Sequence, residues 1–173
     1  LYAFDVSGHR LESLKPRLAR SGLSNVHPAQ IAHERDDRIK RLAGKIDRVL
    51  VDAPCSGLGT LRRNPDLKWR QSPKALEELQ AKQIAILAGA ARLLKSGGRL
   101  VYATCSLLAQ ENERVAEAFT AAQGGEFVPI EAASALEAAR VSDPAALVAG
   151  PYLRLWPHQH HTDGFFAAVW QKR

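Results

Sequence analysis

The chain contains two cysteines, Cys55 and Cys105, among its 173 residues. Each cysteine comes shortly after a run of residues typical of a buried strand, and each is followed directly by a serine. A single cysteine in apolar surroundings is usually a small buried hydrophobe. Two cysteines placed in the same way after two strands favour nucleophilic chemistry instead, because a cysteine thiolate is intrinsically a strong nucleophile.

Two structural alternatives to a catalytic thiol pair stay open at this point. The cysteines could form a disulfide, although cytosolic proteins keep their thiols reduced. They could also bind a metal together with His158, His160 and His161, but these residues lack the compact spacing of zinc ligands.

Acidic residues follow two of the predicted strands. Asp5 ends the first strand, where Rossmann-type folds place an acid that accepts hydrogen bonds from ribose hydroxyls. An aspartate there also serves simply to begin a helix. Asp52 opens the segment Asp52–Gly57, which holds Cys55 as well. Its proline and glycine predict a rigid turn that keeps an acid and a thiol together, and a turn without chemistry is the alternative.

Cations surround an aromatic residue in the segment that follows, residues 61–70. Arg62, Arg63 and Lys68 are candidates for holding phosphates, and Trp69 is a candidate for stacking on an unstacked base. A solvated charged loop explains the same residues equally well. The net charge of +6, from 24 basic and 18 acidic residues, modestly favours a polyanionic partner.

Short β-rich runs alternate with longer helical patterns, which predicts a single α/β domain with a mostly parallel sheet covered by helices. The expected strands are residues 1–4, 25–29, 46–51 and 99–104, with residues 126–130 and 164–170 as an antiparallel edge pair. Helices are expected from Ser7 to Gly22, from Ser72 through Leu94, and from about Glu111 to Gly124. Pro16 should kink or split the first of these. The alanine-rich residues 132–150 are expected to be partly helical or irregular.

The residues beyond the strand ends matter most, because open α/β sheets bind ligands beyond the carboxyl ends of their strands. If the strands ending at Val51 and Thr104 are parallel neighbours, their ends lie roughly 5 Å apart. Both thiols would then face one cleft.

Other classes of protein are disfavoured by what the sequence lacks. No stretch approaches the roughly 18 to 20 consecutive apolar residues of a membrane-spanning helix. The first residues have neither the basic start nor the cleavage site of a secretory signal. We therefore expect a soluble cytoplasmic protein. The chain has no methionine and begins directly on a predicted strand, so we expect it to be the C-terminal portion of a longer protein.

Four segments together resemble the Sun/Fmu-type RNA cytosine-5 methyltransferases. They are Asp52–Gly57, residues 62–69 with the sequences Arg-Arg-Asn-Pro-Asp and Lys-Trp, Tyr102–Ser106, and Thr162–Phe166. Their order and separation also agree with the family, and the likeness covers almost the whole chain. It is greatest to the bacterial enzymes that methylate a cytosine in 16S ribosomal RNA.

The resemblance implies S-adenosylmethionine as the methyl donor, a Rossmann-like methyltransferase fold, and 16S ribosomal RNA as the partner. It assigns the nucleophile that adds to cytosine C6 to Cys105, and help in releasing the methylated RNA to Cys55. Asp5 matches the acid that holds the cofactor ribose. Asp52 matches the acid of the cofactor and cytosine pocket.

Two departures from the family pattern limit these expectations. The glycine-rich cofactor loop, its strand and an N-terminal RNA-binding domain are absent, so residues 1–173 are expected to be the C-terminal portion of the catalytic domain and inactive alone. The missing strand would lie between the strands ending at Asp5 and Val51. No acid follows the second strand at Pro28–Ile31, so no adenine contact is assigned. A noncatalytic RNA-binding module and a thiol enzyme of another reaction are the rival hypotheses.

Overall fold

The computed structural model describes all 173 residues, which form two compact units, residues 1–42 and 43–173. The positions of these units relative to each other are not determined. No helix in either unit combines the length and the apolar character that crossing a membrane requires.

The first unit pairs two parallel strands with two helices. Its elements are β1 (Tyr2–Asp5), α1 (Gly8–Ser21), β2 (His27–Gln30) and α2 (Asp37–Lys40). As predicted, Ser7 caps α1 by accepting the N–H of Arg10, and Gly22 ends it in the left-handed region at φ 69°. Pro16 does not split the helix, contrary to one predicted outcome. It lies on an exposed position, where water can bond the carbonyl that its missing N–H leaves open.

The second unit is built on a six-stranded sheet. Its strands are β3 (Ile46–Asp52), β4 (Leu94–Thr104), β5 (Phe127–Ile130), β6 (Val148–Ala149), β7 (Tyr152–Leu155) and β8 (Phe165–Lys172). The order is β3-β4-β8-β7-β6, and β5 also pairs with β8. β3 and β4 are parallel neighbours, and β5 and β8 are antiparallel, both as predicted. The α/β class is therefore confirmed. The strands β6 and β7 were not predicted, since their residues show no clear alternation.

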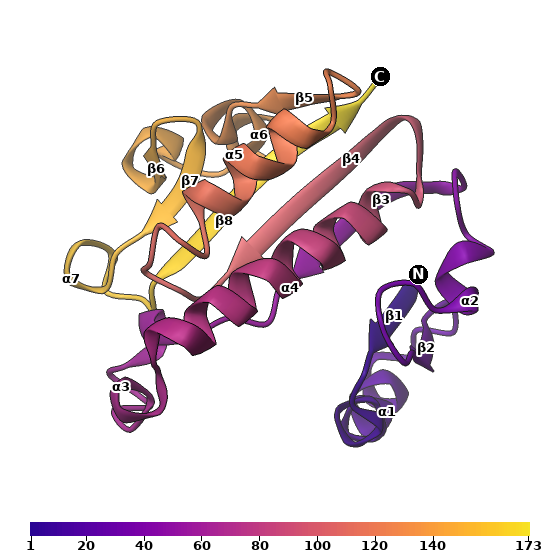
Figure 1. Ribbon diagram of the computed structural model, residues 1–173. Coiled ribbons are helices and arrows are strands. Elements are labelled where there is room, and N and C mark those ends of the chain that lie inside the picture. The colour runs from indigo at the N-terminus through magenta and orange to yellow at the C-terminus, as the bar shows by residue number, and fades with distance from the viewer. The chain divides into compact units, whose positions relative to one another are not determined.

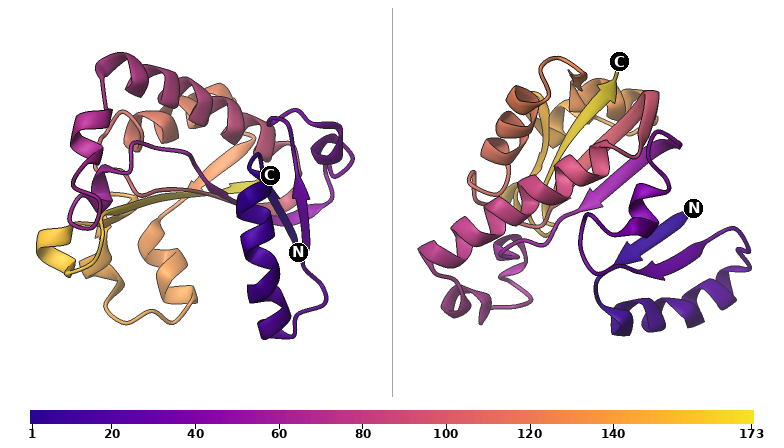
Figure 2. Two further views of the ribbon diagram at one scale, coloured as in Figure 1. Left: turned by 90° about the horizontal axis from the view of Figure 1, so that it is seen from below. Right: turned by 45° about the vertical axis from the view of Figure 1, so that its right-hand side comes forward.

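Helices lie on both faces of this sheet and beyond the ends of its strands (Figures 1 and 2). They are η1 (Leu58–Thr60), α3 (Leu67–Arg70), α4 (Pro73–Ala91), α5 (Glu113–Ala122), α6 (Ala132–Ala138), η2 (Pro144–Leu147) and α7 (Pro157–His160). The left view of Figure 2 shows α4 and α5 on one face and α6 on the other. Ser72 caps α4 by accepting the N–H of Ala75, with Pro73 at the first helical position as predicted.

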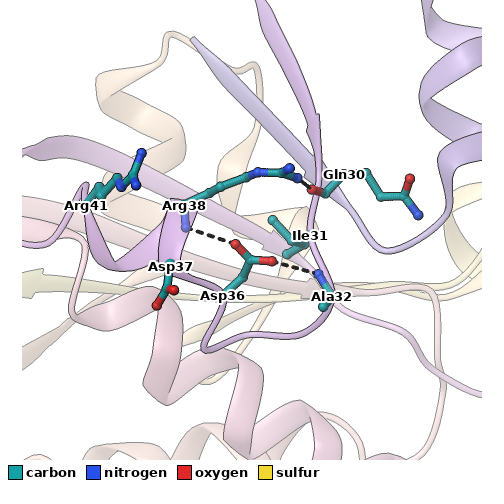
Figure 3. A pocket seen from close by; sticks show the side chains of 7 residues that line it. All are labelled: Gln30, Ile31, Ala32, Asp36, Asp37, Arg38 and Arg41. Atoms are coloured by element: carbon teal, nitrogen blue, oxygen red, sulfur yellow. Dashed lines mark hydrogen bonds between the residues drawn. The ribbon is translucent and has the colours of Figure 1, made fainter.

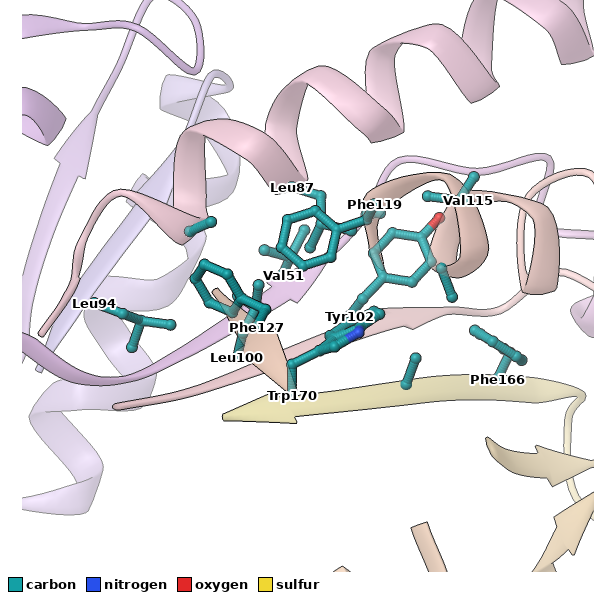
Figure 4. Close-up of a cluster of buried hydrophobic side chains, with 14 residues drawn as sticks. Val51, Leu87, Leu94, Leu100, Tyr102, Val115, Phe119, Phe127, Phe166 and Trp170 are labelled. Atoms are coloured by element: carbon teal, nitrogen blue, oxygen red, sulfur yellow. The ribbon is translucent and has the colours of Figure 1, made fainter. Parts of the chain in front are cut away.

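The core lies between the sheet and the pair α4 and α5 (Figure 4). Leu100, Tyr102 and Thr104 are almost fully buried on one face of β4, as the period of two in a strand requires. Phe119 of α5 packs edge-to-face on Trp170 of β8, with ring centroids 5.0 Å apart. Burying a side chain such as Phe119 contributes roughly 1.5–3 kcal/mol. This packing holds β3 and β4 in place, and their carboxyl ends carry the candidate site.

Two predicted helix boundaries were wrong. α4 ends at Ala91 rather than near Leu94, because Leu94 already pairs with Ile46 of β3. Gly97, at φ 77°, lies inside β4, where the pairing with β3 is interrupted by a register shift. Glu111 was expected in the helix that became α5, but it precedes that helix and is fully buried.

Candidate active site

The parallel pairing of β3 and β4 places the residues after both strands side by side. Asp52 and Ala103 are register partners at the ends of the two strands. Just beyond them, the Sγ atoms of Cys55 and Cys105 lie 3.5 Å apart. Both thiols are free and half-buried. The prediction that these two cysteines meet is confirmed. They form no disulfide in this structure, and neither of them is fully buried.

The two thiols share one hydrogen bond, and this bond makes them unequal. Either sulfur can donate in this contact, and when Cys105 is ionised the Cys55 S–H donates to it. The contact lowers the pKa of Cys105 to about 7, and the same bond together with burial raises the pKa of Cys55. The negative charge of Asp52 acts in the opposite direction on the Cys105 pKa without cancelling the effect. The contact therefore favours ionisation of Cys105 over that of Cys55.

Backbone contacts tie the Cys105 loop to two other segments. The N–H of Gly59 donates to the Cys105 carbonyl oxygen at 2.8 Å, and the N–H of Gly164 donates to the Gly59 carbonyl oxygen at 2.9 Å. A Cβ atom on Gly59 would come within 2.7 Å of the Cys105 carbonyl oxygen, so only glycine allows this approach. Gly59, which lies between the other two segments, thus joins two of the four segments that carry the family resemblance.

A buried glutamate that the sequence reasoning missed connects the loop after β3, which holds Cys55 and Ser56, to the loop after β4, which holds Cys105 and Ser106. We call these the two cysteine loops. The carboxylate of Glu111 accepts hydrogen bonds from the Ser56 N–H at 2.8 Å and from the Ser56 and Ser106 hydroxyls, each at 2.5 Å. The amide of Gln83 also donates to it, at 3.1 Å. The serine after each cysteine was the only sequence signal that could have pointed to such a shared partner. Glu111 itself gave no signal, because a glutamate just before a helix is commonplace.

The predicted RNA-contacting residues lie on and before α3. Trp69 is 80% exposed, and the Lys68 ammonium lies 4.8 Å from its ring centroid. Arg63 forms an ion pair with the buried carboxylate of Asp163, which anchors the loop, while Arg62 is exposed. An exposed aromatic ring among cations, attached to the segment that carries Cys55, suits a single-stranded nucleic acid.

Asp5 lies in the first unit, at the carboxyl end of β1. One carboxylate oxygen accepts the N–H of Ser7 at 2.8 Å, and the other lies 3.7 Å from the Arg10 guanidinium. Its register partner is Gln30, which ends β2. Gln30 also lines a cavity of about 490 Å³ (Figure 3). It is lined by Gln30, Ile31, Ala32, Asp36, Asp37, Arg38 and Arg41.

The metal alternative finds no support in the arrangement of side chains. The structure brings together no group of three or more histidine, cysteine, aspartate or glutamate residues that could hold a metal ion. His160 instead contacts the backbone of Trp156 and Ala146 with its two ring nitrogens.

Comparison with known proteins agrees with the resemblance of the sequence segments. The family model described as 16S rRNA methyltransferase RsmB/F matches residues 1–171. The chain belongs to the RsmB/F family. A relative from Synechocystis, named as a probable ribosomal RNA small subunit methyltransferase B, is 39% identical over 173 residues. That alignment covers 99% of this chain and 37% of the relative, so this RsmB/F chain spans somewhat more than a third of the relative's length.

Solved structures agree on the fold. The crystal structure of PH0851 superposes with a TM-score of 0.84 at 35% identity, covering 99% of this RsmB/F chain and 36% of that protein. NSun6 from Pyrococcus horikoshii, solved with SFG, superposes with a TM-score of 0.78 at 29% identity, covering 99% and 41% of the two chains. This RsmB/F chain therefore shares the α/β arrangement described above with these two proteins.

Proposed function

We propose that the protein methylates C5 of a cytosine in 16S ribosomal RNA, with S-adenosylmethionine as the methyl donor and Cys105 as a covalent nucleophile. The contact between the two thiols carries this proposal, because it favours the thiolate form of Cys105 over that of Cys55. Membership of the RsmB/F family and the names of the relatives support the reaction and the substrate.

The reaction explains why an ionised thiol is needed. Cytosine C5 is too weak a nucleophile to take a methyl group directly. Addition of the Cys105 thiolate to C6 moves the ring electrons toward C5, which becomes enamine-like and accepts the methyl group. A water molecule then takes the C5 proton, and the electron pair left behind restores the C5–C6 double bond as the bond between Cys105 and C6 breaks and sulfur leaves as a thiolate. The departing sulfur returns to a position where the Cys55 S–H, 3.5 Å away, stabilises it as a thiolate.

Asp52 is placed to assist the addition step. It ends β3, three residues before Cys55, and its charge is close enough to affect the pKa of Cys105. We assign it a hydrogen bond to the pyrimidine ring that favours attack at C6. It is exposed, so its carboxylate is open to a ligand.

The residues of the first unit fit a nucleoside cofactor. The carboxylate of Asp5 has an oxygen that no backbone N–H occupies and is open to ribose hydroxyls, which are hydrogen-bond donors. The cavity at Gln30 opens at the same end of the β1–β2 sheet and offers space for the rest of the nucleoside. When bound, S-adenosylmethionine supplies an activated methyl group on its sulfonium sulfur.

The loop before α3 and α3 itself form the proposed RNA contact. We expect that replacing Arg62, Arg63 and Lys68 together by glutamine weakens RNA binding and flattens its salt dependence, because fewer phosphates are neutralised and fewer counterions are released. The slope of log affinity against log salt should fall by about 0.7 for each phosphate of single-stranded RNA that is no longer neutralised. Binding titrations at several salt concentrations measure this slope. Replacing three exposed cations of α4 and its C-terminal end, Lys74, Lys82 and Arg92, by glutamine is the matched control for charge. An unchanged slope in the variant of Arg62, Arg63 and Lys68 would contradict the assignment.

Mapping 5-methylcytosine in ribosomal RNA tests the proposal as a whole. Deleting the complete gene should remove one or more 5-methylcytosines from 16S ribosomal RNA, and restoring it should return them. Bisulfite sequencing or mass spectrometry of RNA digests detects the change. An unaltered pattern would favour one of the rivals, a noncatalytic RNA-binding module or a thiol enzyme of another reaction. RNA binding with no methyl transfer would identify the first of these.

A further inference from the structure

We infer that Glu111 is a positioning residue, which holds the two thiols in contact by accepting hydrogen bonds from the serine that follows each cysteine. Its consequence for catalysis rests on the proposed function, but the arrangement of the thiols does not. Glu111 contacts neither sulfur atom by a hydrogen bond. Its effect would therefore pass through the two cysteine loops.

The contacts of Glu111 are shared between both loops. One carboxylate oxygen accepts the Ser56 N–H at 2.8 Å, and the other accepts the hydroxyls of Ser56 and Ser106 at 2.5 Å each. The two hydroxyl oxygens lie 3.2 Å apart. Distances of this length are typical of hydroxyls that donate to a carboxylate. Since Ser56 follows Cys55 and Ser106 follows Cys105, one side chain fixes the backbone beside both thiols.

Glu111 is itself held firmly in place. It is fully buried, and its own carbonyl oxygen accepts the hydroxyl of Tyr102 at 2.6 Å. The Gln83 amide donates to its carboxylate at 3.1 Å and to the Pro54 carbonyl oxygen at 2.9 Å. No ion pair is found for Glu111 among the described residues, so neutral donors alone compensate its removal from water. Burying an acid in this way is costly unless every donor is aligned, which favours a specific arrangement of both loops.

The thiol contact depends on this arrangement. A sulfur–sulfur distance of 3.5 Å allows the Cys55 S–H to stabilise the Cys105 thiolate, and the hydrogen bond weakens steeply when its partners move apart or lose alignment. The two loops come from segments 50 residues apart in the sequence. Gly59 also ties them, through the Cys105 carbonyl oxygen. Apart from the two serines themselves, the Glu111 carboxylate is the one group that forms hydrogen bonds with both Ser56 and Ser106.

The alkylation of Cys105 by iodoacetamide, followed across pH by mass spectrometry, tests the inference. The complete gene product is used without RNA or cofactor. With Glu111→Ala, we expect the midpoint of Cys105 alkylation to rise from about 7 toward the ordinary value of about 8.5, slowing the reaction at pH 7 on the order of 10-fold. Loss of the Glu111 charge alone would act in the opposite direction, because that charge raises the Cys105 pKa. The sign of the shift therefore separates positioning from electrostatics.

Two further variants complete the design. Glu111→Gln keeps an oxygen that accepts the Ser56 N–H and an amide that can donate to the serine hydroxyls, so its midpoint should not rise. Glu113→Ala is the matched control, because it breaks a partly buried ion pair with Arg154 but touches neither serine. It should leave the alkylation profile unchanged even where it lowers the melting temperature.

A folded Glu111→Ala protein with an unchanged or lowered midpoint would overturn the inference. If that variant does not fold, Ser106→Ala decides instead, because it removes one of the two hydroxyl donors. Its midpoint should rise by a smaller amount, and no rise would reject the inference. Absence of RNA methylation in the unaltered protein would refute the proposed function and leave the thiol measurement intact.

Discussion

Replacing Cys105 with alanine abolishes methyl transfer to RNA in the complete gene product, with turnover reduced on the order of 10⁴-fold or more. The expected loss is large because no other group can add to cytosine C6 in its place. Cys55 lies 3.5 Å away, and burial still raises its pKa when the hydrogen bond to Cys105 is lost, so it supplies little thiolate at neutral pH. Transfer of a labelled methyl group to ribosomal RNA measures the effect.

Folding and binding must be separated from chemistry in this variant. The Cys105 side chain is only half-buried, so its loss should change the melting temperature little, and RNA affinity should be kept. The variant should also form no covalent bond to RNA. Methyl transfer at the unaltered rate by a folded Cys105→Ala protein would refute the nucleophile assignment.

Replacing Cys55 with alanine should produce a covalent protein–RNA adduct. The proposed product of methyl transfer is RNA still bonded to Cys105, and its release requires sulfur to leave as a thiolate. Without the Cys55 S–H that thiolate loses its hydrogen-bond donor, so release slows more than any other step. A band of reduced mobility that survives denaturing gel electrophoresis and disappears on RNase treatment detects the adduct. The double variant lacking both cysteines is the control and should form none.

The same Cys55 variant has a second expected signature, in pH dependence. The Cys55 hydrogen bond lowers the pKa of Cys105 to about 7, so removing the donor raises that pKa toward about 8.5. The ionised fraction of Cys105 at pH 7 then falls from about half to about 3%. Adduct formation by Cys55→Ala should therefore increase from pH 7 to pH 8.5. Normal product release with no adduct at either pH would remove the helper role.

Much of the fold was predictable because it depends on local patterns. Ser7 and Gly22 mark the ends of α1, and Ser72 with Pro73 marks the start of α4, since capping uses side chains next to the helix end. The continuous apolar run before Asp52 indicated a buried strand. The boundary errors arose where strand pairing extended β4 back to Leu94, which no local pattern reveals.

The sequence by itself determined the residue types of the site, the strand ends on which they lie, and the family to which the chain belongs. The tertiary structure decided which side chains meet. The distance between the thiols depends on how β3 pairs with β4. The role of Glu111 depends on two serines 50 residues apart being brought to one carboxylate. Contacts between distant segments arise only when the core packs, so the spacing of residues along the chain does not encode them.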